Sequence, residues 1–269
     1  IDNGSTFNIN TDADILGLPL GNSILNSGII NHNFNGECTI NIPFSSTWGL
    51  FTTQINLNNS GSILTIGGLQ EGYSSSNGEF NLVSGSIFNS LKPFSITADA
   101  FAEQNITINN NGTISNLLIT TPANNSNLVY INGTGTIQKL SLDGGQTVIN
   151  NTQIISDSLN LITGFIKTSV GGLIDLQADA IVSASGNAVI DGNLKWNINS
   201  GIEVSKIFPL GNVTFNNLTS TYEDLYAPIS LHFTEVFNSG SLTATSISLD
   251  HFDIFNSNII DSKSVNRTW

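Results

Sequence analysis

The sequence predicts an all-β protein: a right-handed parallel β-helix, or solenoid, over residues 1–200, followed by a partial antiparallel β-sandwich-like module over residues 201–269. Three observations predict this class. A short unit recurs along the chain, apolar and polar residues alternate within it, and Asn- and Gly-rich breaks separate the units. No stretch of ten residues shows a sustained helical period of 3.6 residues.

The recurring unit is a glycine followed within two positions by an Ile in an alternating run. Measured at this Ile, successive units are 33, 24, 27, 23 and 29 residues apart. An irregular period of this size is typical of a solenoid, whose stacked coils bury a common core. We therefore expect four of these isoleucines to point inward as one ladder: Ile63, Ile87, Ile114 and Ile137.

Alternating strands and turn residues make up the rest of each unit. Residues 63–66 (ILTI) and 106–108 (ITI) alternate at period two, whereas residues 109–112 (NNNG) are typical of a turn because Asn and Gly tolerate positive φ. Evenly spaced strands would also fit a β-sandwich. The internal pattern that the units share favours stacked coils over paired hairpins.

The pattern changes at residues 197–201 (NINSG), after which the strands become longer and richer in Phe. Pro209 and Pro228 suit edge strands or strand starts, so we interpret this region as antiparallel. It is short for a sandwich of about 100 residues, and it ends on an aromatic strand at Trp269. We expect other strands, from downstream sequence or a partner, to complete it.

Charge and cysteine content exclude several classes of protein. Charged residues make up 10% of the chain, and the net charge is −13. An acidic surface of this kind repels nucleic acid and anionic lipid, which bind clustered Lys and Arg. No apolar run approaches the 18 residues of a membrane span, so we expect no membrane insertion. Cys38 stands alone and is expected to be a small buried residue rather than a nucleophile.

Six short stretches in the C-terminal part resemble one family. They are residues 164–169 (GFIKTS), 182–185 (VSAS), 189–196 (VIDGNLKW), 208–211 (FPLG), 226–231 (YAPISL) and 265–269 (VNRTW). In this order they resemble large secreted cell-surface adhesin and filament-like proteins of the Bacteroidota. The resemblance covers residues 160–269, while the earlier coils match only in style.

The resemblance implies a secreted or cell-surface location, reached through the type IX secretion route. It implies a non-catalytic adhesive or filament-like structural role. The expected partners are other surface or filament subunits, the secretion machinery, or extracellular glycans.

Four carboxylates are candidate metal ligands. Asp12 and Asp14 lie in a loose calcium-like run, and Asp175 and Asp179 flank three residues of a coil. Carboxylate oxygens suit Ca²⁺, although the twelve-residue loop of an EF-hand is absent here. We expect no other cofactor. His32, His232 and His251 are scattered, without a second ligand at zinc spacing.

An enzyme is the first alternative, either a β-helix polysaccharide lyase or a glycoside hydrolase. A lyase needs basic residues to stabilise its enediolate, but only Lys167 and Lys195 lie near the aspartates. A hydrolase needs two carboxylates about 5–9.5 Å apart; the close pairs are Asp12 with Asp14, and Glu223 with Asp224. We therefore expect no catalysis. A phage-type receptor-binding fibre is the second alternative, and trimeric intertwining of strands would favour it.

Overall fold

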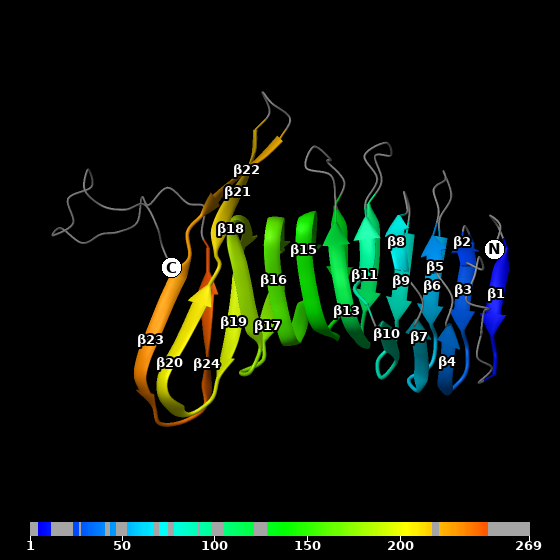
Figure 1. Ribbon diagram of the computed structural model, residues 1–269, viewed down its shortest axis with the longest axis horizontal. Helices are drawn as coiled ribbons and strands as arrows, with labels where there is room; N and C mark the ends of the chain where they lie inside the picture. Colours follow the sequence, from blue (N-terminus) through cyan, green and yellow to red (C-terminus); the bar gives the residue numbers. More distant parts are fainter. Residues whose placement is uncertain are drawn as a thin grey trace.

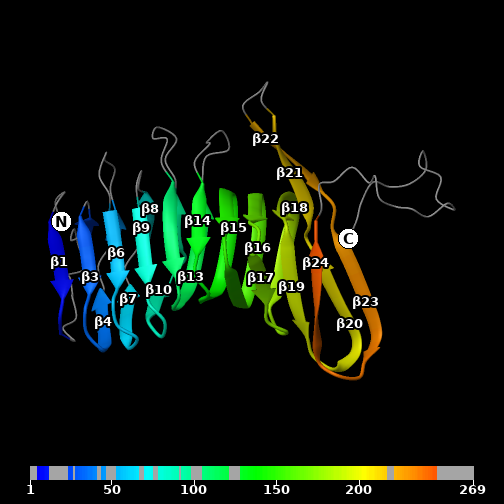
Figure 2. The same cartoon turned by 180° about the vertical axis from the view of Figure 1, so that it is seen from behind.

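The computed structural model describes residues 5–11, 24–26, 28–40, 44–46, 53–66, 70–74, 78–90, 92–97, 105–120, 128–216 and 221–246. In this part every regular element is a β-strand, and no helix with the length and apolarity of a membrane span is found. Parallel strands stack along the long axis as a β-solenoid, and antiparallel strands follow at its C-terminal end (Figures 1 and 2). The predicted all-β solenoid class is confirmed.

Each coil contributes strands to three faces. Face 1 contains β1 (Thr6–Ile9), β3 (Ile29–His32), β6 (Thr53–Leu57), β9 (Gly78–Leu82), β12 (Ile106–Asn110), β14 (Val129–Asn132) and the last residues of β15 (Thr136–Ile149), β16 (Thr152–Thr168) and β18 (Ile181–Asp191). Face 2 contains β4 (Gly36–Ile40), β7 (Ser62–Ile66), β10 (Ile87–Ser90), the first residues of β13 (Thr113–Thr120), β15 and β16, then β17 (Leu173–Leu176) and β19 (Asn193–Ile198). Face 3 contains β2 (Ile24–Asn26), β5 (Phe44–Ser46), β8 (Gln70–Ser74), β11 (Phe94–Thr97) and the remaining parts of β13, β15, β16 and β18.

Register within each face places equivalent residues of successive coils side by side. The sequence offset between neighbouring coils ranges from 18 residues, between Asn132 and Asn150, to 28 residues, between Asn81 and Asn109. The strands hold their register while the loops between faces differ in length. This explains why the repeat is irregular in the sequence.

Inward positions form continuous apolar columns, because side chains alternate along each strand. The inward column of face 2 is fully buried for most of its length: Cys38, Leu64, Phe88, Ile114, Ile137, Ile155, Leu176 and Trp196. Inside the solenoid, Phe88 of face 2 packs edge-on against Phe80 of face 1 and Phe94 of face 3, at centroid distances of 4.8 and 4.9 Å. Large apolar side chains therefore fill the centre of this coil.

The predicted isoleucine ladder is confirmed for Ile114 and Ile137 and wrong for Ile63 and Ile87. The last two are half-buried on the outer side of face 2, where they pair with each other. Their coils bury the serine that follows the glycine, so alternation turns the next residue outward and Leu64 or Phe88 inward. The glycine unit thus occurs in two registers that differ by one residue, which reverses the side that each residue faces.

Glycine is required at the corner between faces 3 and 1. Gly164 has a φ of +93°, and a Cβ placed there would lie 2.1 Å from the carbonyl oxygen of Gly145 in the preceding coil. Any side chain would therefore clash with backbone as well as strain φ. Here the glycine of the recurring unit allows two coils to stack closely.

Antiparallel strands cover the C-terminal end of the solenoid. β20 (Gly201–Phe208) pairs with β23 (Ile229–Val236), β21 (Gly211–Asn216) with β22 (Thr221–Tyr226), and β24 (Gly240–Thr245) with β19. Pairing thus changes from parallel to antiparallel beside the predicted boundary at residue 200. β24 extends the solenoid's own sheet, and Phe208 and Leu210 pack into its core. The prediction that the module is incomplete involves residues 247–269, which lie outside the described residues.

Candidate functional site

A row of asparagines runs along the outer side of face 1 through seven successive coils. After the first member, each side-chain amide donates a hydrogen bond to the amide oxygen of the preceding member, over 2.7–3.0 Å. The members of this asparagine ladder are Asn8, Asn31, Asn56, Asn81, Asn109, Asn132 and Asn150. Register aligns them, because each lies one residue after an inward residue of the face 1 column.

The ladder leaves hydrogen-bonding capacity facing the solvent. An amide group has two N–H donors and two acceptor lone pairs, and an internal ladder member uses one donor and one lone pair within the row. The other donor and lone pair of each half-buried amide are not used within the row, and the amides recur at the spacing of stacked strands, about 4.8 Å. Face 1 therefore presents a regular line of neutral donors and acceptors.

A shorter row lies beside the ladder at the corner between faces 1 and 2. Asn58 donates to Asn33 over 2.7 Å, and Asn33 donates to Asn10 over 3.2 Å. Asn33 also reaches Asn8 of the main ladder at 3.4 Å. In this part of the solenoid the outer surface is thus built from two joined rows of amides.

The sequence carries a signal for the ladder that patterns within a single strand do not reveal. An apolar residue followed directly by Asn recurs in the seven coils of the ladder, as in Ile55-Asn56, Phe80-Asn81 and Ile131-Asn132. The dipeptide is inconspicuous in a chain rich in Asn. It becomes informative only when the strands are aligned by their inward residues.

Two of the candidate metal ligands, Asp175 and Asp179, have side-chain partners in the following coil. The oxygens of Asp175 accept hydrogen bonds from Lys195 Nζ at 2.8 Å and Asn197 Nδ2 at 2.7 Å. Asp179 accepts one from Asn199 Nδ2 at 3.1 Å. Among the residues that the structure describes, no three His, Cys, Asp or Glu side chains are grouped to hold a metal ion. Asp12 and Asp14 lie outside them.

One histidine has polar partners that the sequence did not suggest. His232 on β23 contacts Ser205 Oγ through Nδ1 at 2.9 Å and Glu203 Oε2 through Nε2 at 3.0 Å, both on β20. The groups follow the order of a charge-relay triad, but Ser contacts Nδ1 and the carboxylate Nε2, the reverse of a hydrolase. The side chains of His232 and Glu203 are 55% and 67% exposed. The cluster is thus a solvated cross-strand contact.

Two further residues that the sequence singled out, Cys38 and His32, are buried in the core. Cys38 is buried in the inward column of face 2, as predicted. His32 is fully buried in face 1 between Ile9 and Leu57, and its ring stacks on Phe34 at 4.5 Å. Burial lowers the pKa of His32 because the apolar surroundings disfavour the charged imidazolium, while nearby backbone groups oppose this in part. His251 lies outside the described residues.

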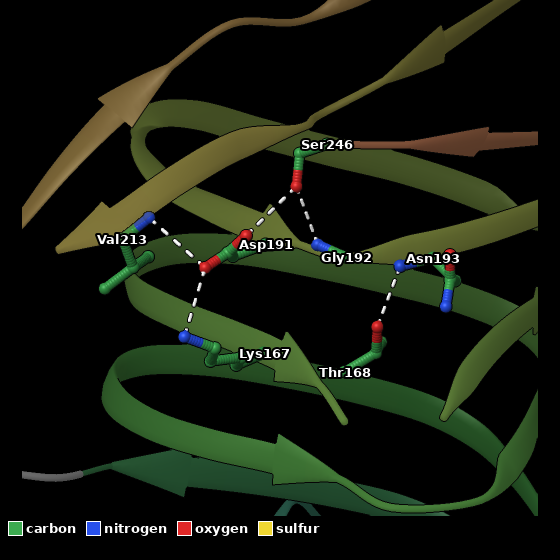
Figure 3. A network of polar contacts seen from close by, with 7 residues as sticks. All are labelled: Lys167, Thr168, Asp191, Gly192, Asn193, Val213 and Ser246. Atoms are coloured by element: carbon green, nitrogen blue, oxygen red, sulfur yellow. Dashed lines mark hydrogen bonds and ion pairs between the residues drawn. The ribbon is translucent and has the colours of Figure 1, made fainter. Parts of the chain in front are cut away.

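Asp191 joins the last coil to the antiparallel strands (Figure 3). It is almost fully buried, and its Oδ1 accepts from Ser246 Oγ at 3.1 Å. Its Oδ2 accepts from the backbone N–H of Val213 at 3.3 Å and lies 3.6 Å from Lys167 Nζ. The Gly192 N–H completes the junction by donating to Ser246 Oγ at 2.7 Å. One carboxylate thus connects β16, β18 and β21 with the residue that follows β24.

A second contact, between β19 and β20, covers the C-terminal end of the core. The Trp196 ring of β19 packs against Phe208 of β20 at 5.7 Å, and Lys206 Nζ lies 4.3 Å from its centroid. Lys206 also donates to the carbonyl oxygen of Ala178 at 2.8 Å. Burial lowers the pKa of Lys206, and the nearby Asp179 partly opposes this. The pair resembles a cation–π contact, which is stronger when partly desolvated.

The fold and these surfaces define a β-solenoid with an amide-lined outer face and an antiparallel end. Comparison of the chain with protein-family models, curated proteins and solved structures found no match. The resemblance to Bacteroidota surface proteins stays a prediction.

Proposed function

We propose that this chain is a non-catalytic segment of a secreted or cell-surface protein, with an adhesive or filament-like structural role. The observation that supports this most directly is the asparagine ladder along face 1. Asn ladders add side-chain hydrogen bonds to those of the backbone in stacked parallel strands. A rod reinforced in this way is suited to hold a surface at a distance or to line up with other subunits.

The charges of the solenoid agree with a structural role. Lys195 is paired with Asp175, and Lys167 with Asp191. Lys195 thus contacts a candidate aspartate directly, whereas Lys167 supports the junction at Asp191. The motifs at residues 164–269 support export to the surface by the type IX route. Other surface subunits, the secretion machinery and extracellular glycans remain the proposed partners.

Two measurements test this proposal. Antibodies against the protein should label intact cells that produce it, without permeabilisation. Beads coated with residues 1–269 should attach to those cells or their matrix more than beads coated with an unrelated protein of equal charge. Labelling only after permeabilisation, together with no excess attachment, would contradict the proposal.

Size and shape in solution separate this function from a fibre. Light scattering should give a monomer mass, whereas a stable trimer would support the phage-type fibre instead.

A further inference from the structure

One part of face 1 combines an aromatic ring with neutral polar groups. Tyr130 lies half-buried on the outer side of β14, and register places Thr107 and Val148 on either side of it. The ladder runs two residues further along the same strands. Together these residues form the Tyr130 strip, which consists of Thr107, Asn109, Tyr130, Asn132, Val148 and Asn150.

The strip is uncharged although the chain carries a net charge of −13. In the column of Tyr130 the nearest charged residues are Glu79 beyond Thr107 and Lys167 beyond Val148. Lys167 lies 3.6 Å from the Asp191 carboxylate, whereas Glu79 accepts a hydrogen bond from the neutral amide of Gln54 over 2.9 Å and keeps its negative charge. An acidic polymer would therefore find no unpaired cation in this column.

The antiparallel strands limit the strip on its C-terminal side. Phe165 and Val189 occupy the outer side of face 1 in the following coils, and both are buried against Val213 of the β21–β22 hairpin. Tyr226 of β22 packs at the edge of the same cluster. The hairpin thus covers the apolar outer residues of the last coils, whereas Tyr130 stays partly open to solvent.

From these observations we propose that the Tyr130 strip binds an extended, neutral polysaccharide. The unused N–H groups and lone pairs of Asn109, Asn132 and Asn150 match sugar hydroxyls, which both donate and accept hydrogen bonds. The ring of Tyr130 supplies an apolar face with a polar tip, the combination that suits tyrosine to wet interfaces. The lack of an unpaired cation beside the strip favours a neutral polymer over an acidic one. This inference rests on the proposed adhesive function and names its ligand class and surface.

Affinity electrophoresis tests this proposal. The protein, residues 1–269, is run through native gels that contain galactomannan, hydroxyethyl cellulose, dextran or, as the acidic comparison, alginate. At least one neutral polysaccharide should retard the protein more than alginate does. Tyr130→Ala should weaken that retardation about tenfold, the effect of losing a central aromatic contact of about 1.4 kcal/mol.

Two control variants separate binding from folding. Phe237→Ala removes an exposed aromatic residue outside the strip and should leave retardation unchanged. Tyr130→Phe keeps the ring and should retain most of it. The proposal is overturned if no neutral polysaccharide retards the protein, if alginate does so equally, or if Tyr130→Ala runs as the parent protein does while unfolding normally. In those cases bead attachment to cells would still support the adhesive function, so the two failures are distinguishable.

Discussion

The coils of the solenoid and the strands that cover its C-terminal end are held together in different ways. In the coils the inward positions recur, so apolar columns run through the solenoid, and one amide row connects seven successive coils. At the C-terminal end the contacts described here do not repeat, and each depends on a single residue such as Asp191 or Trp196. Repetition spreads stability over many similar contacts, whereas the end depends on a few that have no duplicate.

The core of a coil should give the largest effect. Phe88→Ala removes the ring that contacts both Phe80 and Phe94, so the free energy of unfolding should fall by about 3–5 kcal/mol. Denaturant titration measures this loss. The neighbouring Ile87→Ala is the matched control, because Ile87 faces outward. Equal losses for the two variants would contradict the inward and outward assignment.

The junction should give a smaller but localised effect. Asp191→Ala leaves the Val213 N–H and the Ser246 hydroxyl without their acceptor, and each buried group left unsatisfied costs about 1–3 kcal/mol. Hydrogen exchange should rise in β21 and β24 and change little in β6 and β9. Asp157→Ala, at an exposed aspartate, serves as the control. A uniform rise along the whole chain would argue against a separate junction.

Buried His32 should make stability depend on pH. Its folded-state pKa is lowered, so below a pH of about 6.5 the unfolded chain takes up a proton that the folded chain does not. The free energy of unfolding should therefore fall as the pH falls from this value, by at most about 1.4 kcal/mol per pH unit from this group. His32→Leu should remove this part of the slope, whereas Phe237→Leu, which changes an exposed residue without an ionisable group, should keep it. Identical slopes in His32→Leu and the parent protein would contradict the assignment.

Breaking the ladder at one asparagine should lower the free energy of unfolding by about 1 kcal/mol. Asn81 donates to Asn56 and accepts from Asn109, so Asn81→Ala removes two side-chain hydrogen bonds of modest net value. Asn89→Ala is the control, because Asn89 makes one long contact of 3.4 Å to Thr65 on face 2. The ladder would be energetically unimportant if both variants unfolded at the same denaturant concentration.

We expect the protein to have no catalytic activity on polysaccharides. Incubation with neutral and acidic polysaccharides should release neither reducing ends nor unsaturated uronates, because Asp175 is held by Lys195 and Asn197. A release of either product that is lost in Asp175→Ala or Asp179→Ala would support the enzyme alternative.

The fold class was predictable because alternation and turn residues are local properties of the sequence. Whether a single side chain points inward or outward was harder to predict. A strand has two sides, and Gly-Ser-Ile in one coil and Gly-Thr-Ile in the next differ by one position in where the inward series begins. Only contact with the neighbouring coil determines that choice, as the pairing of Phe88 with Ile114 illustrates.

The polar surfaces were the least predictable part. Asp175 stood out by residue type, yet its partners lie 20 and 22 residues further along the chain. His232 reaches Ser205 across 27 residues, through an antiparallel register that the sequence does not specify. The asparagine ladder is a third case, because each Asn is ordinary alone and gains meaning only beside its equivalents in other coils.

The direction of the ladder also has a mechanical consequence. Its hydrogen bonds run along the rod, so under a pull on the two ends they lie in series, each carries the whole force, and they break one at a time. Each coil should then detach in turn and release a length of chain set by its 18 to 28 residues. A tether built in this way would lengthen in steps under load and would take up energy at every step instead of breaking at one point.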